Sequence, residues 1–329
     1  MGNDRTLTLQ AADFQVPPRL ACESLVARAT LAADALPPAR EGVVFRVFWE
    51  DAAAPDVNAP LAFADLHVED HLVVGRHSAC DVRLSHPSVA LRHVLVRARV
   101  AEGRVALLVS DLATDAGFRV GPLQASSRGV ICDGPTVLGV STHLLVVLPT
   151  IATGTADESA LRPRVVDADP ALARPIAHDR AALAVRTQID LVSRTLIRPF
   201  AAPLPVEILA SSERPFARLA LRGPGGRVVI APSCADLDAL LLVGRYPRCR
   251  HGELSPFSGR VSRVHAAIAR EGDALRVIDL ASMNGIATRT VDGVIKARAV
   301  RVTSRASIRL GGPDDRLDVE IVGKEDLEA

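Results

Sequence analysis

The sequence predicts an all-β chain that holds two copies of one domain. Short runs rich in β-branched and aromatic residues, such as 43–49, are separated by turn signals, which is typical of strands joined by hairpins. Glycine and histidine positions also recur at a nearly constant distance, in the pairs Gly75 and Gly244 (169 residues apart), His93 and His265 (172), and Gly117 and Gly285 (168). A constant offset across several motifs indicates an internal repeat whose loops differ slightly in length.

The composition of the chain limits its class. A length of 329 residues suffices for about two domains, and a hydrophobic content of 48% supports folded cores. The 39 basic and 38 acidic residues nearly cancel, and aromatic residues make up 3%. Since nucleic-acid binding needs a strongly basic surface, we expect no nucleic-acid partner.

The cysteines and apolar runs exclude further classes. Five widely spaced cysteines without a Cys-x-x-Cys pair predict neither a disulfide framework nor a zinc site. No apolar run approaches the roughly 18 residues of a membrane span, and no signal peptide is evident. We therefore expect a cytoplasmic protein without metal, cofactor or membrane contact. The preference for Arg over Lys, together with abundant Ala, is typical of a bacterial protein from a high-GC genome.

Changes in composition divide the chain into five segments. They are an N-terminal arm (1–42), the first copy of the domain (43–150), a linker with several prolines (151–204), the second copy (205–323) and a short tail (324–329). The boundaries follow the change from arm or linker composition to strand-like runs.

Two segments outside the copies favour helices. The arm has an Ala-rich stretch, Glu23–Leu36, that fits either a short helix or a flexible arm. In the linker, apolar residues recur at spacings of four, three and four residues, at Val185, Ile189, Val192 and Leu196. This spacing predicts an amphipathic helix at about 180–198, either packed on its own domains or docked on a partner.

The second copy gathers hydrogen-bond donors at three strand ends. An apolar run ends at Arg245, a loop ends at Ser262 and Arg263, and a hairpin strand ends shortly before Asn284. Two guanidiniums, a hydroxyl and an amide with no carboxylate among them would attract an anion. The planar fork of an arginine suits phosphate oxygens in particular.

At these residues the sequence resembles the forkhead-associated (FHA) domain. The FHA pattern is Gly-Arg, then Ser-x-x-His, then Asn-Gly, and the matches are Gly244-Arg245, Ser262-x-x-His265 and Asn284-Gly285. The resemblance implies an antiparallel β-sandwich whose end loops bind phosphothreonine peptides. The fold class expected for the chain is thus two antiparallel, FHA-like β-sandwiches joined by a partly helical linker.

The resemblance also implies a role for each matching residue. Arg245 and Ser262 would hold the phosphate, and Asn284 would hydrogen-bond the peptide backbone. The loop-shaping positions would be Gly244, His265 and Gly285. Arg263 would either face the site or be a solvated loop charge.

The first copy keeps the loop-shaping positions but departs at the ligand contacts. It retains Gly75, Arg76, His93 and Gly117, whereas Ala90 stands for Ser262, Leu91 for Arg263 and Ala116 for Asn284. Each lost contact to a phosphate would cost about 1–3 kcal/mol of binding free energy. We expect this copy to fold but to bind phosphopeptides poorly, and to serve as a docking or dimerising surface.

These features predict a non-catalytic adaptor in Ser/Thr kinase signalling. Its partner would be a phosphothreonine-containing protein, in trans or in its own arm or linker, where Thr6, Thr8, Thr150, Thr153 and Thr155 lie. The alternative is a scaffold that assembles proteins through both sandwiches and ignores phosphate. Ser262, His265 and Asp279 have the residue types of a hydrolase triad, but no Gly-x-Ser-x-Gly elbow precedes the serine.

One feature of the second copy leaves two outcomes open. Twenty residues separate Arg245 from His265, whereas 17 separate Arg76 from His93, and the longer loop adds arginines. The longer loop would either strengthen phosphate capture or obstruct the site. The oligomeric state is open as well.

Overall fold

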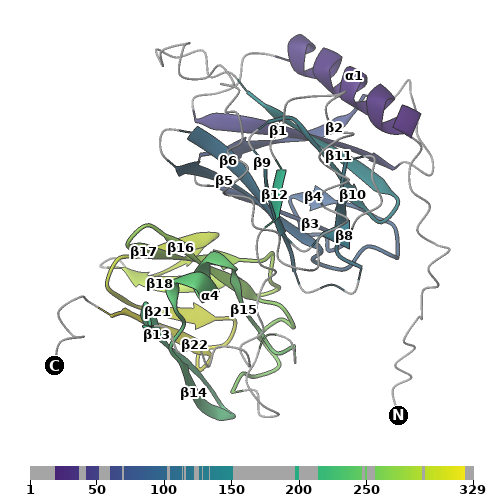
Figure 1. Ribbon diagram of the computed structural model, residues 1–329. Coiled ribbons are helices and arrows are strands. Elements are labelled where there is room, and N and C mark those ends of the chain that lie inside the picture. Colours follow the sequence, from purple (N-terminus) through teal and green to yellow (C-terminus); the bar gives the residue numbers. More distant parts are fainter. Residues whose placement is uncertain are drawn as a thin grey trace, which may run out of the picture.

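The computed structural model places both copies and one helix (Figure 1). It describes residues 19–36, 42–51, 60–68, 70–101, 104–112, 114, 116–121, 126–127, 129–132, 134–150, 197–199, 214–246, 249, 256–290 and 293–322. Most of the predicted linker helix at about 180–198 lies outside these residues. Its last two positions belong instead to a strand, Ile197–Pro199.

The first copy is a sandwich of two six-stranded sheets. One sheet has the order β2-β1-β11-β10-β7-β8 and the other β12-β9-β6-β5-β3-β4. The strands are β1 (Val43–Asp51), β2 (Ala62–His67), β3 (His71–Gly75), β4 (Val82–Arg83), β5 (Val94–Ala101), β6 (Arg104–Asp111), β7 (Phe118–Val120), β8 (Ser126–Ser127), β9 (Gly129–Cys132), β10 (Thr136–Val140), β11 (His143–Pro149) and β12 (Ile197–Pro199).

The second copy is a sandwich of six strands against four. Its sheets have the orders β14-β13-β22-β21-β18-β19 and β15-β16-β17-β20. Its elements are β13 (Ala217–Gly223), β14 (Gly226–Ile230), α4 (Cys234–Asp238), β15 (Leu241–Val243), β16 (Ala266–Glu271), β17 (Ala274–Asp279), β18 (Ile286–Thr290), β19 (Gly293–Ala297), β20 (Ala299–Val302), β21 (Arg305–Leu310) and β22 (Arg316–Ile321).

The predicted fold class is confirmed. Among the described strands, every pairing is antiparallel except the two-residue pair between β3 and β4. Each sandwich encloses its own core, built around residues such as Phe45 and Leu107 in the first copy and Ile268 and Leu317 in the second. The turns use the expected chemistry, since Gly272 between β16 and β17 has a φ of 62°.

Helix α1 (Arg19–Ala35) covers the outer face of the first copy (Figure 1). Its Leu25 and Ala29 are fully buried against Phe48, Leu144 and Val146, which point outward from β1 and β11. These outward apolar side chains give the helix a surface to cover.

The matching face of the second copy is polar. Its strands β13, β21 and β22 carry the ion pairs Arg222–Asp318 and Arg305–Glu320 on the outside. Charged pairs of this kind are stable in water and need no cover. The sequence difference between the two copies therefore accounts for a helix on the first copy.

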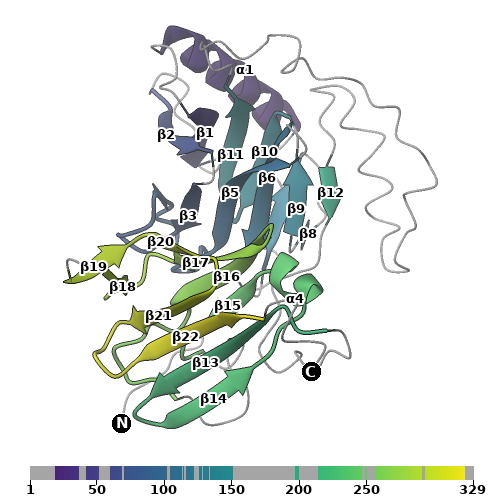
Figure 2. The ribbon, with the colours of Figure 1, turned by 90° about the vertical axis from the view of Figure 1, so that its left-hand side faces the viewer.

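Strand β5 of the first copy is buried on both faces. Val94, Val96 and Ala98 point into the core of the first copy, whereas Leu95 packs against the second copy. Strand β16 alternates in the same way, with Ile268 in its own core and Ala267 facing the first copy. The two sandwiches thus share an apolar interface, with β15–β17 lying against β3, β5 and β6 (Figures 1 and 2).

The two copies contribute equivalent positions to this interface. The equivalent pairs are Val73 and Leu242, Cys80 and Cys249, Leu95 and Ala267, and Leu112 and Leu280. They are separated by the same offset that relates the sequence motifs. The same face of each sandwich covers the other, as the two halves of an isologous dimer do. This face of the first copy is therefore covered by the second copy within the chain.

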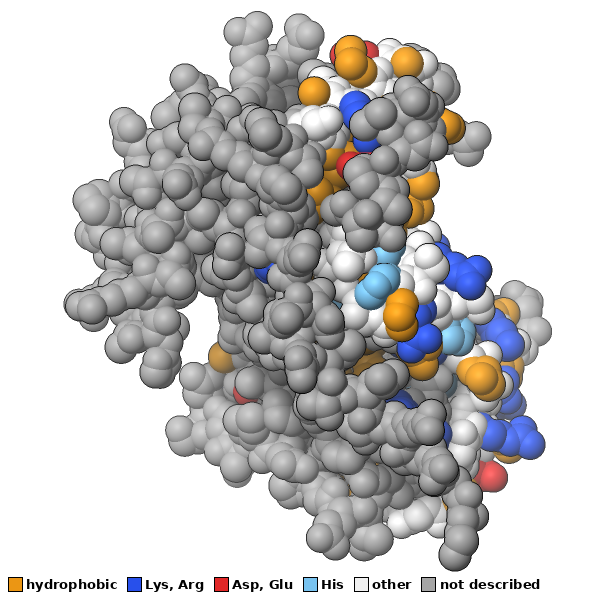
Figure 3. Space-filling model, turned by 90° about the vertical axis from the view of Figure 1, so that its right-hand side faces the viewer, with side chains coloured by type: hydrophobic (Ala, Val, Ile, Leu, Met, Phe, Trp, Pro, Cys, Tyr) orange, Lys and Arg blue, Asp and Glu red, His pale blue; other side chains and the backbone are white. Residues whose placement is uncertain are grey.

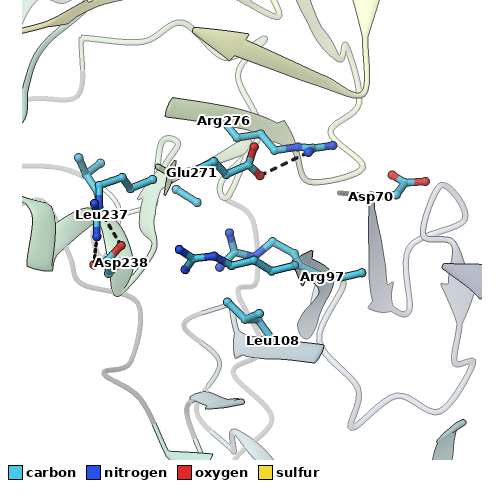
Figure 4. Close-up of a pocket in the computed structure, with 11 residues that line it drawn as sticks. Asp70, Arg97, Leu108, Leu237, Asp238, Glu271 and Arg276 are labelled. Carbon is cyan, nitrogen blue, oxygen red and sulfur yellow. Dashed lines mark hydrogen bonds and ion pairs between the residues drawn. The ribbon is translucent and has the colours of Figure 1, made fainter. Parts of the chain in front are cut away.

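Arg97 lies in a pocket at this interface, between the two copies (Figure 4). It is 8% exposed, and its Nε donates no hydrogen bond among the described residues. The neighbouring carboxylates bind other arginines, Asp238 at 2.8 Å from Arg270 and Glu271 at 3.3 Å from Arg276. Burial lowers the pKa of Arg97 from 12.5 to about 10, which is the mark of a charge held away from water.

Replacing this buried charge should stabilise the chain. We expect Arg97→Met to raise the free energy of unfolding by about 1–2 kcal/mol, because an apolar side chain of similar length removes the cost of desolvating a charge. Urea unfolding monitored by circular dichroism measures the difference. Arg83→Met, at an exposed arginine of β4, should stay within about 0.5 kcal/mol of the unmodified chain. A less stable Arg97→Met chain would contradict this account.

Candidate functional site

Two loops meet at one end of the second sandwich. They are the long connection between β15 and β16, which contributes both of its ends, and the turn after β17. The backbone N–H of Arg245 donates to the carbonyl of Ser262 at 3.1 Å. The N–H of Met283 donates to Ser262 Oγ at 3.2 Å, and Asn284 Nδ2 donates to the carbonyl of Arg260 at 2.7 Å. The structure thus brings Arg245, Ser262 and Asn284 together, although they are far apart in the sequence.

Guanidiniums border this cluster. Arg245 is half-buried, and its Nε donates to the carbonyl of Val261, which fixes the side chain across the loop. Arg260 and Arg263 are exposed on the same loop. The carboxylates of the region are already hydrogen-bonded, Asp279 to Ser282 in its own turn and Asp315 to Ser258 of the β15–β16 loop. The cluster therefore presents cations and donors, which favours an anionic ligand.

A buried histidine joins the two loops. His265 is fully buried, and its Nδ1 accepts a hydrogen bond from the N–H of Ser262 at 3.0 Å. Because Nδ1 is an acceptor, the neutral ring carries its proton on Nε2, which lies 3.0 Å from the carbonyl oxygen of Gly285. Burial lowers the pKa of His265 to about 4, although the Gly285 carbonyl acts in the opposite direction. The neutral imidazole therefore acts as a brace between the Ser262 loop and the Asn284 turn.

Gly244 and Gly285, two of the predicted loop-shaping residues, are needed for different reasons. At Gly244 a side chain would clash with a neighbouring loop, and at Gly285 the backbone adopts a left-handed conformation. A Cβ atom on Gly244 would lie 2.1 Å from the carbonyl oxygen of Arg263, far inside van der Waals contact. Gly285 has a φ of 72°, in the left-handed region that side chains rarely adopt. Both positions thus set the close approach of loops that carry the polar cluster.

The first copy contains the same brace. His93 Nδ1 accepts from the N–H of Ala90 at 3.2 Å, and His93 Nε2 lies 2.7 Å from the carbonyl oxygen of Gly117. Arg76 Nε donates to the carbonyl of Val89, as Arg245 does to Val261.

Gly75 of the first copy has the same role as Gly244 of the second copy. A Cβ on Gly75 would lie 2.5 Å from the carbonyl oxygen of Leu91, so this glycine permits the same close approach as Gly244. The loops of both copies are therefore held in the same way.

The first copy lacks the side-chain donors that the second copy presents. Ala90 and Ala116 offer no polar side chain, and Leu91, at the position of Arg263, is 46% exposed. An exposed leucine beside a retained arginine provides one cation but no hydroxyl or amide. The shape of the loops is retained and the ligand chemistry is lost.

Sequence reasoning missed Ser282 as a member of the site. Its Oγ donates to Asp279, accepts from the N–H of Gly285 at 3.0 Å and lies 3.0 Å from His265 Nε2. In the first copy Thr114 makes the equivalent bonds to Asp111 and to the N–H of Gly117. A hydroxyl three residues before the glycine in both copies was the signal in the sequence.

One face of the molecule carries mainly basic side chains among its described residues. Figure 3 shows the right-hand side of Figure 1, where Lys, Arg and His side chains gather on the described part of the face and acidic side chains are sparse. An acidic ligand that approaches this face meets positive charge first, which speeds its encounter.

The comparison with known proteins gives one curated relative. A segment of 105 residues is 34% identical to the FHA domain-containing protein PS1 of Arabidopsis thaliana, covering 31% of this chain and 7% of that protein. Both copies fold as sandwiches, and both carry the glycine–histidine–glycine brace of the FHA pattern. Both sandwiches are FHA-like. The chain matches only a small part of the relative, and no protein-family model matches it.

Solved FHA domains are similar to single copies of the repeat. The FHA domain of CT664 from Chlamydia trachomatis is 18% identical, with a TM-score of 0.27, over 32% of this chain and 96% of that domain. The MEK1 FHA domain, solved in complex with a phosphothreonine peptide of HOP1, is 16% identical, with a TM-score of 0.25, over 32% of this chain and 97% of that domain.

In the part of the chain that the structure describes, no helix is long and apolar enough to cross a bilayer. No group of three or more His, Cys, Asp or Glu side chains in that part is arranged to hold a metal ion.

The buried histidine makes folding stability depend on pH. An unfolded histidine takes up a proton near pH 6.5, whereas the folded chain keeps His265 neutral down to about pH 4. The unfolded state therefore binds more protons in this window, and the free energy of unfolding should fall by a few kcal/mol as the pH falls from 6.5 to 4. His71, whose pKa is also lowered to about 4, mainly by burial, acts in the same direction.

Urea unfolding at stepped pH measures this slope. The variant His265→Asn retains an oxygen that can accept from the N–H of Ser262, and it should show a shallower slope than the unmodified chain. An equal slope in the two chains would mean that His265 is not held neutral.

Proposed function

We propose that the second copy binds phosphothreonine peptides, and that the chain is a phosphothreonine-dependent adaptor in Ser/Thr kinase signalling. One observation carries the proposal. Arg245, Ser262 and Asn284 converge on two loops that the neutral His265 joins. The first copy has the same brace without those side chains, so the polar cluster is not a by-product of the fold.

The hydrogen bonds of the cluster leave capacity for a ligand. Ser262 Oγ accepts from Met283, so the hydroxyl proton can be donated to a phosphate oxygen. Asn284 uses Nδ2 once, towards Arg260, and retains a second N–H and a carbonyl oxygen for a peptide backbone. Arg245 supplies a positive charge for a group that carries about −1.5 to −2 charges.

Similarity to FHA domains supports the proposal. The MEK1 FHA domain was solved with a phosphothreonine peptide, and the curated relative is named for its FHA domain. FHA domains are in general protein-binding modules without catalysis, and this chain acts in that way, without a cofactor. Arg263, exposed in the Ser262 loop, adds charge beside the phosphate.

The partner is a protein phosphorylated on threonine by a Ser/Thr kinase, in the cytoplasm. A site in this chain's own arm or linker is the second source of such a threonine. Thr150 is a poor candidate because its hydroxyl donates to the carbonyl of Val43 at 2.6 Å and is part of the fold. Thr6, Thr8, Thr153 and Thr155 lie outside the described residues. Neither nucleic acid nor a membrane is a partner in this proposal.

A phosphate-independent scaffold is the second candidate. The observation that favours it is the apolar interface between the copies, which builds one two-domain unit without any ligand. In that case the polar cluster would be a solvated loop, and substitutions in it would leave partner binding unchanged.

The two candidates differ in the effect of Arg245→Ala. With the full chain and a degenerate phosphothreonine peptide library, we expect binding that needs the phosphate. Arg245→Ala should weaken binding of a selected peptide about 10- to 100-fold, because a charge-assisted contact worth about 1.4–2.8 kcal/mol is lost. The full chain is used because a separated second copy would expose its apolar sheet face.

The matched control is Arg76→Ala, at the equivalent position of the first copy. Its affinity should stay within about twofold of the unmodified chain, since the first copy lacks the accompanying donors. Equal losses in the two variants would contradict the assignment of the site to the second copy. Phosphoserine and unphosphorylated peptides complete the comparison, and equal binding of all three forms would favour the scaffold.

A further inference from the structure

Arg92 of the first copy reaches across the interface to the second copy. Its Nε donates to the carbonyl of Leu280, and its Nη2 donates to the carbonyl of Ala281 at 2.6 Å. The side chain is half-buried, so these bonds are partly shielded from water. A planar guanidinium that binds two successive carbonyl oxygens fixes the direction of both peptide groups.

The bound carbonyls belong to the turn that carries Asn284. Ala281 has a φ of 51°, in the left-handed region, where an alanine is strained. Ser282, Met283 and Asn284 follow directly, and their bonds to His265, Ser262 and Arg260 form the other side of the cluster. The turn is thus held from two sides, by Arg92 of the first copy and by the loops of its own sandwich.

This contact has no counterpart in the opposite direction. Arg92 lies one residue before His93, and the equivalent residue of the second copy, one before His265, is Val264. A valine side chain cannot donate to the carbonyls of the first copy. Arg298 of the second copy contacts Asp81 and the carbonyl of His71 across the interface, and this contact does not involve the Asn284 turn.

Arg92 also belongs to the degenerate loop of the first copy. The segment 90–93 occupies the place of Ser262–His265, where the second copy presents its hydroxyl and Arg263. In the first copy the polar group of this segment points to the neighbouring sandwich, where it binds backbone oxygens. The loop that lost its ligand contacts therefore has a contact of its own.

We propose that the first copy acts as a co-domain that sets the affinity of the second copy, with Arg92 as a positioning residue for the Asn284 turn. The inference rests on the proposed phosphothreonine site. Without the guanidinium, Leu280 and Ala281 lose two charge-assisted bonds, and the strained turn samples other conformations. Asn284 is then out of place for a peptide backbone more of the time, which weakens binding without removing the phosphate contacts.

The test compares Arg92→Ala, Arg92→Lys and the control Arg83→Ala in the full chain. Arg83 is an exposed arginine of the same copy, on β4. Isothermal titration with a phosphothreonine peptide selected on the unmodified chain gives both the dissociation constant and the stoichiometry. We expect Arg92→Ala to raise the dissociation constant about 5- to 20-fold at unchanged stoichiometry, Arg92→Lys to raise it less, and Arg83→Ala to leave it unchanged.

The stoichiometry separates positioning from folding. A merely structural role would lower the fraction of chain that binds, with the dissociation constant of the remainder unchanged, and that result would overturn the inference. A dissociation constant of Arg92→Ala within twofold of the unmodified chain would overturn it as well. If Arg92→Ala does not fold, Arg92→Lys takes its place, because lysine keeps a charged donor at this position. A dissociation constant of Arg92→Lys within twofold of that of the unmodified chain would then overturn the inference.

Amide hydrogen exchange without ligand separates this inference from the proposed function. Arg92→Ala should speed exchange at Ser282 and Gly285 at least fivefold, because their N–H groups are protected by the turn. If the unmodified chain binds no phosphothreonine peptide, the proposed function fails. Faster amide exchange in Arg92→Ala would still support the conclusion that Arg92 fixes the Asn284 turn. Unchanged exchange at both amides would overturn the inference whatever the peptide does.

Discussion

The structure of both loop ends depends on a buried, neutral histidine. In each copy the imidazole accepts one backbone hydrogen bond at Nδ1 and lies against a glycine carbonyl with Nε2, so one side chain joins two loops. In the second copy the bonds fix the tautomer, and burial lowers the pKa of His265, which keeps this ring uncharged. In the second copy, Ser262 and Asn284 lie on the two loops that this ring joins.

The brace explains why one fold supports two different surfaces. Because the loops are fixed by His93 or His265 and by glycines, the side chains around them can change without loss of the fold. The second copy places a hydroxyl, an amide and arginines on the braced loops, whereas the first copy places alanine and leucine there. In the first copy Arg92, between Leu91 and His93, instead binds the backbone of the second copy.

The packing of the two copies brings Arg92 of the first copy within reach of the second copy. Equivalent sheet faces pack together through small and aliphatic side chains such as Ala267 and Leu95, so the copies lie with their loop ends close enough for Arg92 to reach Leu280. This packing buries the charge of Arg97, because Arg97 occupies a strand position that faces the neighbouring domain. Ala269, its equivalent in the second copy, is apolar and fits the same interface.

Much of the fold could be predicted from the sequence because its signals are local. Strand runs and turn signals depend on residues near one another, the repeat is visible as a nearly constant offset between matching residues, and the histidine–glycine pattern places the loops. The packing of the copies could not be predicted in this way. Val94, Val96 and Ala98 give β5 one apolar face, but the other face carries both Leu95 and Arg97, and this mixed pattern does not show what covers it. The role of Arg92 was hidden for the same reason, because its acceptors are carbonyl oxygens of another domain, which no side-chain pattern reveals.

The central claim is that ligand chemistry resides in the second copy and loop support in both. Nuclear magnetic resonance of the full chain, with backbone amides followed during titration with a phosphothreonine peptide, tests it most directly. The account predicts large shifts for Arg263, Met283 and Asn284, and none for the equivalent first-copy residues Leu91 and Ala116. Shifts centred on the first-copy loops, or no shifts at saturating peptide, would contradict it.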